Sequence, residues 1–227
     1  MRRWPGLLSG ALLGLMPLAA TAEIVSATYA EPTQRYQHGV FGETEEWGAL
    51  AFELSSGQRI ILRLPETRVF EDIAPRLADV DGDGAPEMVV VETDIALGAR
   101  LAIYDEAGFV AATPFIGQTH RWLAPIGAAD LDGDGLVELA YIDRPHLARL
   151  LRVWRFEGGA LVEVAQAEGL TNHRLGDPAI SGGLRDCGEG PEMITADAPA
   201  ACAFSALMAK EQVPRCTSAM LPAGKPA

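Results

Sequence analysis

The sequence contains the same acidic loop twice, and each copy runs directly into an apolar segment. The first copy reads ADVDGDGAPEMVVVETD, from Ala78 to Asp94, and the second reads ADLDGDGLVELAYID, from Ala129 to Asp143. Carboxylates packed this closely repel one another unless a positive charge lies among them. The repeat therefore constrains the fold, which must place two equivalent loops before two strands, and it also constrains the chemistry of those loops.

Strand signals dominate the chain beyond its N-terminal segment. Residues 47–66 hold two alternating apolar runs joined by Ser55-Ser56-Gly57, which predicts a hairpin. Glu106-Ala107-Gly108 and Glu157-Gly158-Gly159 occupy matching places after the two acidic loops and are predicted to be turns. Short strands at such even spacing are typical of an antiparallel sandwich, a barrel or a propeller.

The spacing of the repeat selects among these three architectures. Glu138 follows Glu87 by 51 residues, and a degraded third copy, LRDCGEGPEMITAD, places Glu192 54 residues after Glu138. A period of this length fits one four-stranded propeller blade. We therefore predict an all-β fold, a β-propeller-like array of roughly three to four four-stranded blades of about 51–54 residues, forming a partial or small propeller.

The N-terminus has the pattern of a secretory signal peptide. Arg2 and Arg3 precede an apolar run from Leu7 to Leu18, and small residues follow at Ala20-Thr21-Ala22. We expect cleavage after residue 22, so that residues 1–22 are a signal peptide and the mature protein is exported to the periplasm or the extracellular space. No second apolar run long enough to span a bilayer follows, and we expect no membrane span after cleavage.

The repeat domain is predicted to cover residues 23–197 and to be followed by an irregular tail, residues 198–227. The tail lacks alternation, and we expect either disorder with a short helix near residues 203–211 or a repeat that has diverged. Export permits one disulfide among the three cysteines, with one thiol left over. The three cysteines are Cys187, Cys202 and Cys216, and their spacing does not indicate a zinc or redox site.

The charge of the chain excludes one class of partner. It carries 31 acidic and 18 basic residues, a net charge of −13, which becomes −15 without Arg2 and Arg3. Affinity for nucleic acid comes largely from lysines and arginines that neutralise phosphates. We therefore expect no nucleic-acid partner, whereas such a polyanion suits the binding of cations.

The alternating acids of each loop have the spacing of a cation site. With Asp79 as position one, Asp81 and Asp83 are positions three and five, and Glu87 is position nine. Alternate residues on a tightly curled loop can turn their oxygens toward one centre, and the glycines at positions four and six permit the positive φ that curling needs. Hard oxygen donors suit Ca²⁺ better than Mg²⁺, which demands a stricter octahedron.

An EF-hand begins in the same way but does not fit the rest of the loop. It places a bidentate glutamate at position twelve and lies between two helices. Position twelve here is Val90 in the first copy and Tyr141 in the second, and a β-run follows each loop. What remains is a nine-residue loop, D-x-D-G-D-G-x-x-E, that leads straight into a strand.

These two loops resemble the calcium loops of FG-GAP repeats, also called VCBS repeats, which build the propeller of integrin alpha chains and of many bacterial secreted proteins. The resemblance covers residues 36–197, and Phe41-Gly42 is similar to the family's Phe-Gly signature. The family usually has Asp at the ninth position and seven blades, and this chain departs from both. The resemblance implies two Ca²⁺ sites. In the first the ligands would be Asp79, Asp81, Asp83, the carbonyl of Ala85 and Glu87, and in the second Asp130, Asp132, Asp134, the carbonyl of Leu136 and Glu138.

The sequence holds no nucleophile elbow, P-loop, H-E-x-x-H or G-x-G-x-x-G motif. The four histidines stand singly in predicted loops and are interpreted as polar surface: His38, His120, His146 and His173. Three tryptophans could stack on sugars, but we expect them to pack between blades: Trp47, Trp122 and Trp154.

We therefore predict a secreted, calcium-stabilised, non-enzymatic module that binds an unidentified protein or glycan, with calcium in a structural role. One alternative is a secreted hydrolase of polysaccharides or phosphoesters on the same scaffold. It would show a cleft with convergent titratable groups. A binding module would instead show an apolar or aromatic patch on one loop face. A truncated repeat protein without a ligand is the third possibility.

Overall fold

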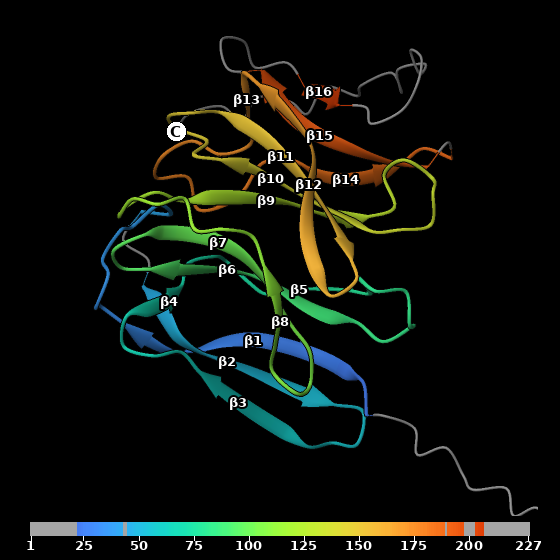
Figure 1. The fold of residues 1–227 in the computed structure, drawn as a ribbon. Coiled ribbons are helices and arrows are strands. Elements are labelled where there is room, and N and C mark those ends of the chain that lie inside the picture. Colours follow the sequence, from blue (N-terminus) through green and yellow to red (C-terminus); the bar gives the residue numbers. More distant parts are fainter. Residues whose placement is uncertain (1–21, 43–44, 189, 198–202, 207–227) are drawn as a thin grey trace, which may run out of the picture.

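The computed structural model describes residues 22–42, 45–188, 190–197 and 203–206, and no helix occurs among them. Within this part of the chain there is accordingly no helix that could cross a membrane. The predicted signal peptide, apart from residue 22, lies outside the described residues, as does most of the predicted tail. The strands are labelled β1 to β16 in Figure 1, and the fold is all-β, as the sequence predicts.

The first sheet combines an N-terminal group of strands with a four-stranded meander. Its order is β1-β2-β4-β6-β7-β8, with β3 on β2 and β5 on β6. A single paired position, Trp47 opposite Phe70, joins β2 to β4. The hairpin predicted at Ser55-Ser56-Gly57 is confirmed, because Gly57 N donates to Leu54 O over 2.8 Å. The bounds are β1 (Ile24–Thr33), β2 (Glu46–Leu54), β3 (Arg59–Arg63), β4 (Arg68–Phe70), β5 (Arg76–Ala78), β6 (Glu87–Asp94), β7 (Gly98–Tyr104) and β8 (Phe109–Ala112).

Two further antiparallel sheets follow along the chain. The second has the order β12-β11-β10-β9, and the third has β13-β15-β14 with β16 on β15. Residues 203–206 therefore form a strand, where the sequence had allowed the start of a short helix. The bounds are β9 (Leu123–Ala129), β10 (Glu138–Asp143), β11 (Leu150–Glu157), β12 (Ala160–Glu168), β13 (Leu170–Thr171), β14 (Gly183–Asp186), β15 (Pro191–Asp197) and β16 (Ala203–Ala206).

The sheets lie on top of one another in chain order, so that the central strands are buried on both faces (Figure 1). Along β6, Met88 and Val90 pack with the N-terminal strands, whereas Val89 and Val91 pack with the second sheet. Strand β10 alternates in the same way between the core shared with β6 and β7 and a core shared with the third sheet. This double burial explains the uninterrupted apolar runs at residues 88–91 and 139–142.

The predicted register of the repeat is confirmed. The first acidic loop joins β5 to β6, the second joins β9 to β10, and the degraded third copy joins β14 to β15. The described residues form an open series of sheets, with no closed propeller ring among them, and the number of blades remains a prediction.

The tryptophans pack in the cores, as expected. Trp122 and Trp154 belong to the core between the first and second sheets, where they are 2% and 8% exposed. Trp47 is partly buried against the core of the N-terminal strands. Stacking on a sugar would need exposed indole faces, so Trp122 and Trp154 serve the core.

At Gly98, the first residue of β7, the backbone of the loop before β9 comes very close. Its φ is +77°, and an added Cβ would lie 2.3 Å from the carbonyl oxygen of Gln118 and 2.8 Å from that of Arg121. We expect Gly98→Ala to lower the free energy of unfolding by on the order of 3 kcal/mol, because backbone must move. Gly57→Ala is the control, since Gly57 has a similar φ of +82° with nothing within 4 Å, and it should cost about 1 kcal/mol. Equal losses in urea unfolding would contradict this close approach.

Candidate metal centres

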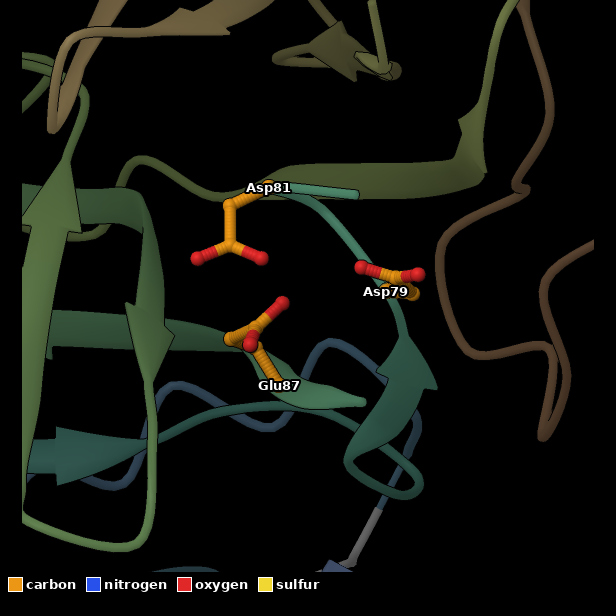
Figure 2. Close-up of side chains that lie close together, drawn as sticks. All are labelled: Asp79, Asp81 and Glu87. Atoms are coloured by element: carbon orange, nitrogen blue, oxygen red, sulfur yellow. The ribbon is translucent and has the colours of Figure 1, made fainter. Parts of the chain in front are cut away.

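The first acidic loop places three carboxylates around one point at the entrance of β6. Oxygens of Asp79, Asp81 and Glu87 all lie within 4.8 Å of one another. Figure 2 shows the carboxylates of Asp81 and Glu87 turned toward each other, with Asp79 beside them. Asp81 is exposed on the loop, whereas Glu87 is the first residue of β6 and is only 7% exposed. The strand thus fixes one ligand, and the loop carries the other two.

Backbone hydrogen bonds hold this loop in its curled form. The two oxygens of Asp79 accept the N–H groups of Gly82 and Gly84 at 2.8 and 3.0 Å. Both glycines have positive φ, +79° and +93°, which a residue with a side chain adopts only with strain. Glu87 Oε2 accepts the N–H of Val80 at 2.8 Å and so closes the loop on the strand. Its other oxygen takes no part in this bond and is available to a cation.

The second loop repeats this backbone arrangement. Asp130 accepts the N–H groups of Gly133 and Gly135 at 2.7 and 2.9 Å, and Glu138 Oε2 accepts that of Leu131 at 2.8 Å. Its carboxylates form the matching triad, Asp130, Asp132 and Glu138, again within 4.8 Å of one another. The two loops are therefore copies in structure as well as in sequence.

The acids at position five lie outside both triads. Asp83 Oδ1 accepts the N–H of Ala85 at 2.7 Å, and Asp134 Oδ1 accepts that of Leu136 at 2.9 Å. Each of these acids therefore stabilises the turn with one oxygen. Coordination by Asp83 and Asp134, and by the carbonyl oxygens of Ala85 and Leu136, remains a prediction.

The first loop carries negative charge that its own residues do not offset. Burial raises the pKa of Glu87, and the charges of Asp81, Asp83 and Asp79 raise it further, while the hydrogen bond from Val80 lowers it. A cation among these groups would relieve the repulsion. Among the described residues the group consists of oxygen donors, which fit a hard ion such as Ca²⁺ better than a softer metal that prefers nitrogen or sulfur.

The second loop differs because an arginine reaches into it from β11. Arg155 Nη2 lies 2.6 Å from Asp132 Oδ2, its Nη1 lies 2.8 Å from Asp134 Oδ2, and its Nε lies 2.6 Å from Glu138 Oε1. The hydrogen bonds to Glu138 and Asp132 raise the pKa of Arg155 and keep it charged. Sequence reasoning missed this residue, because it lies 17 positions beyond Glu138 in a strand that has no acidic motif.

The interpretation of the histidines as isolated surface residues was wrong. His146 Nε2 lies 2.8 Å from His173 Nδ1, and His173 is only 4% exposed. Trp122 packs against both rings. His173 Nε2 lies 3.0 Å from the carbonyl oxygen of Asp177, which can only accept, so His173 carries its proton on Nε2 and accepts from His146 at Nδ1.

The other two histidines gather beside this pair. His38 Nδ1 contacts Glu71 Oε1 at 2.5 Å, and the ring of His120 stacks on Tyr36 with centroids 4.9 Å apart. The rings of His38 and His120 lie 5.1 Å apart. No local signal could reveal this cluster, because its members come from four loops that only the stacking of the sheets brings together.

A cavity of about 470 Å³ opens next to Glu71 and is lined by several carboxylates. Each of the buried ones already has a structural partner. Glu46 accepts the backbone N–H of His38 at 2.7 Å, Glu71 binds the ring of the same histidine, and Asp72 is paired with Arg76. These contacts hold the surrounding loops in place.

The histidine pair makes the stability of the fold depend on pH. Burial, followed by the neighbouring His173, lowers the pKa of His146 to about 4. The unfolded chain therefore binds a proton at this residue before the folded chain does, and stability falls as the pH drops from about 6.5 toward 4. We expect His146→Gln, which keeps a donor toward His173, to lose less stability over this range, as measured by urea unfolding at pH 7, 6, 5 and 4. Identical pH profiles for the two proteins would contradict the assignment.

Comparison with known families agrees with the sequence motif. Residues 76–141 match the family model of the FG-GAP-like repeat. The matched segment begins at β5 and ends in β10, and it contains both acidic loops. No curated protein and no solved structure matched the chain.

Proposed function

From the FG-GAP-like repeat that this chain carries at residues 76–141, we propose an exported, calcium-stabilised binding module of the β-propeller type. The observation that carries the proposal is the oxygen triad of Asp79, Asp81 and Glu87, whose charges have no cationic partner among the described residues. A divalent cation is the simplest partner for such a set, and Ca²⁺ is the one that accepts many oxygens in a flexible loop.

Calcium at this loop would act on the fold through the strand that follows it. Glu87 opens β6, and the next four residues of that strand lie in the two cores on its faces. A cation that draws Asp79 and Asp81 toward Glu87 would fix the β5–β6 connection and with it the entrance of a strand that is buried on both faces. Because the ion would bind the folded loop and not the unfolded chain, it would stabilise the folded state.

The proposed partner is a protein or a glycan on the outside of a cell, consistent with the signal peptide expected at residues 1–22. The net charge of −13 opposes a nucleic-acid partner. Extracellular calcium modules work with dissociation constants of about 10⁻⁴–10⁻³ M, so even a weak loop of this kind would be occupied there. The cavity beside Glu71 presents the convergent carboxylates that the hydrolase alternative requires, but Glu46, Glu71 and Asp72 are engaged in contacts with His38 and Arg76, and we therefore propose the binding module.

Removal of calcium should lower the melting temperature of the full chain. With calcium at 100 times its dissociation constant, linkage gives about 2.7 kcal/mol of stabilisation, or roughly 5–10 °C for a chain of this size. We expect this difference between melts with added calcium and melts with a chelator. An unchanged melt in the chelator would reject the calcium proposal.

Asp81→Asn tests the site itself, since the amide keeps an oxygen that can accept the N–H of Asp83, as Asp81 Oδ1 does at 3.1 Å. We expect this variant to fold and to lose most of its calcium response. Asp94→Asn is the matched control, because Asp94 accepts the N–H groups of Ala96 and Leu97 at the opposite end of β6 from the loop. A full calcium response in Asp81→Asn would show that the ligand is wrongly assigned.

A further inference from the structure

The two acidic loops share a backbone but differ in charge. In the second loop, the three guanidinium nitrogens of Arg155 each contact the carboxylate of a different acid, at positions three, five and nine. These acids are Asp132, Asp134 and Glu138, three of the four side chains expected to bind calcium there. The arginine side chain is only 17% exposed, so most of it is shielded from solvent.

The strand register places Arg155 in this position. Glu138 is paired with Arg155 across β10 and β11. In the first repeat Met88 is paired with Tyr104, so the position opposite Glu87 is that of Asp105, the residue after β7. An acid therefore stands in the first repeat where the second has a cation. Asp105 uses its carboxylate to bind the β7–β8 turn and supplies no positive charge to the loop.

Arginine and calcium compete for the same oxygens. Calcium needs oxygens at about 2.3–2.6 Å on several sides, and a guanidinium that holds three carboxylates at hydrogen-bond distance occupies that space. Entry of the ion would require the loss of all three charge-assisted bonds and would bring a divalent cation close to the guanidinium cation. In the third, degraded loop an arginine also contacts the glutamate, but it comes from the strand before the loop: Arg185 Nε of β14 lies 2.9 Å from Glu192 Oε2.

We propose that this chain binds calcium at the first loop only, and that Arg155 is the permanent counter-ion of the second. This inference rests on the proposed function for the first site and changes the expected number of ions from two to one. The second loop keeps its shape without metal, because the arginine performs the charge compensation that the ion performs in the first.

Calorimetric calcium titration of the full chain, stripped with a chelator beforehand, tests the proposal by its stoichiometry. The wild-type protein should bind one ion, and Arg155→Met, which keeps an apolar stem, should bind two. Arg152→Met is the control, because Arg152 lies on the same strand but pairs with Asp143 and Glu163, away from the loop, and it should bind one. Two ions in the wild type, or one ion in both the wild type and Arg155→Met, would overturn the inference.

Two milder variants repeat the test if Arg155→Met does not fold. Asp81→Asn should bind no ion, whereas Asp132→Asn should bind one with an affinity within about threefold of wild type. Loss of binding in Asp132→Asn alone would place the ion in the second loop and overturn the inference. If the wild type binds nothing and Arg155→Met binds one, the role of Arg155 stands and the proposed function fails. If neither binds, both fail.

Discussion

The burial of β6 and β10 on both faces is the constraint on which the rest of the structure depends. Each strand supplies side chains to two cores at once, so that its position fixes the sheets on either side. A strand so placed cannot shift by one residue without exchanging the side chains of both cores. Each of these strands begins with a glutamate, and one carboxylate oxygen of that glutamate accepts an N–H from the loop before it. The acidic loops are thus attached to the least movable part of the fold.

Local sequence patterns predicted the strands and the loops well. The hairpin at residues 55–57, the turns at Gly108 and Gly158, and the register of the repeat follow from alternation and from glycine placement, which are short-range properties. The same is true of Asp79, Asp81 and Glu87, whose spacing along nine residues brings their oxygens together on one curled loop. The strand at residues 203–206 was missed because the Ala-rich sequence there has no alternation. This segment forms a strand by pairing with β15.

The features that sequence could not predict depend on contacts between distant segments. Arg155 reaches the second loop through the register of β10 with β11, and nothing near residue 155 indicates that a loop of acids lies opposite. The histidines were interpreted one at a time, whereas His146 and His173 are 27 positions apart and meet only where two loops cross. For the histidines, the partners depend on how the sheets stack, which the sequence around each residue does not reveal.

The arginine in the second loop also bears on the order in which the chain could assemble. A repeat that carries its own positive charge can close in a compartment poor in calcium, as soon as β10 and β11 pair. A repeat whose loop depends on a dissolved ion gains its full stability only where that ion is present. If the first loop alone takes calcium, the second repeat would be complete without it and would offer a formed surface on which its neighbour could mature.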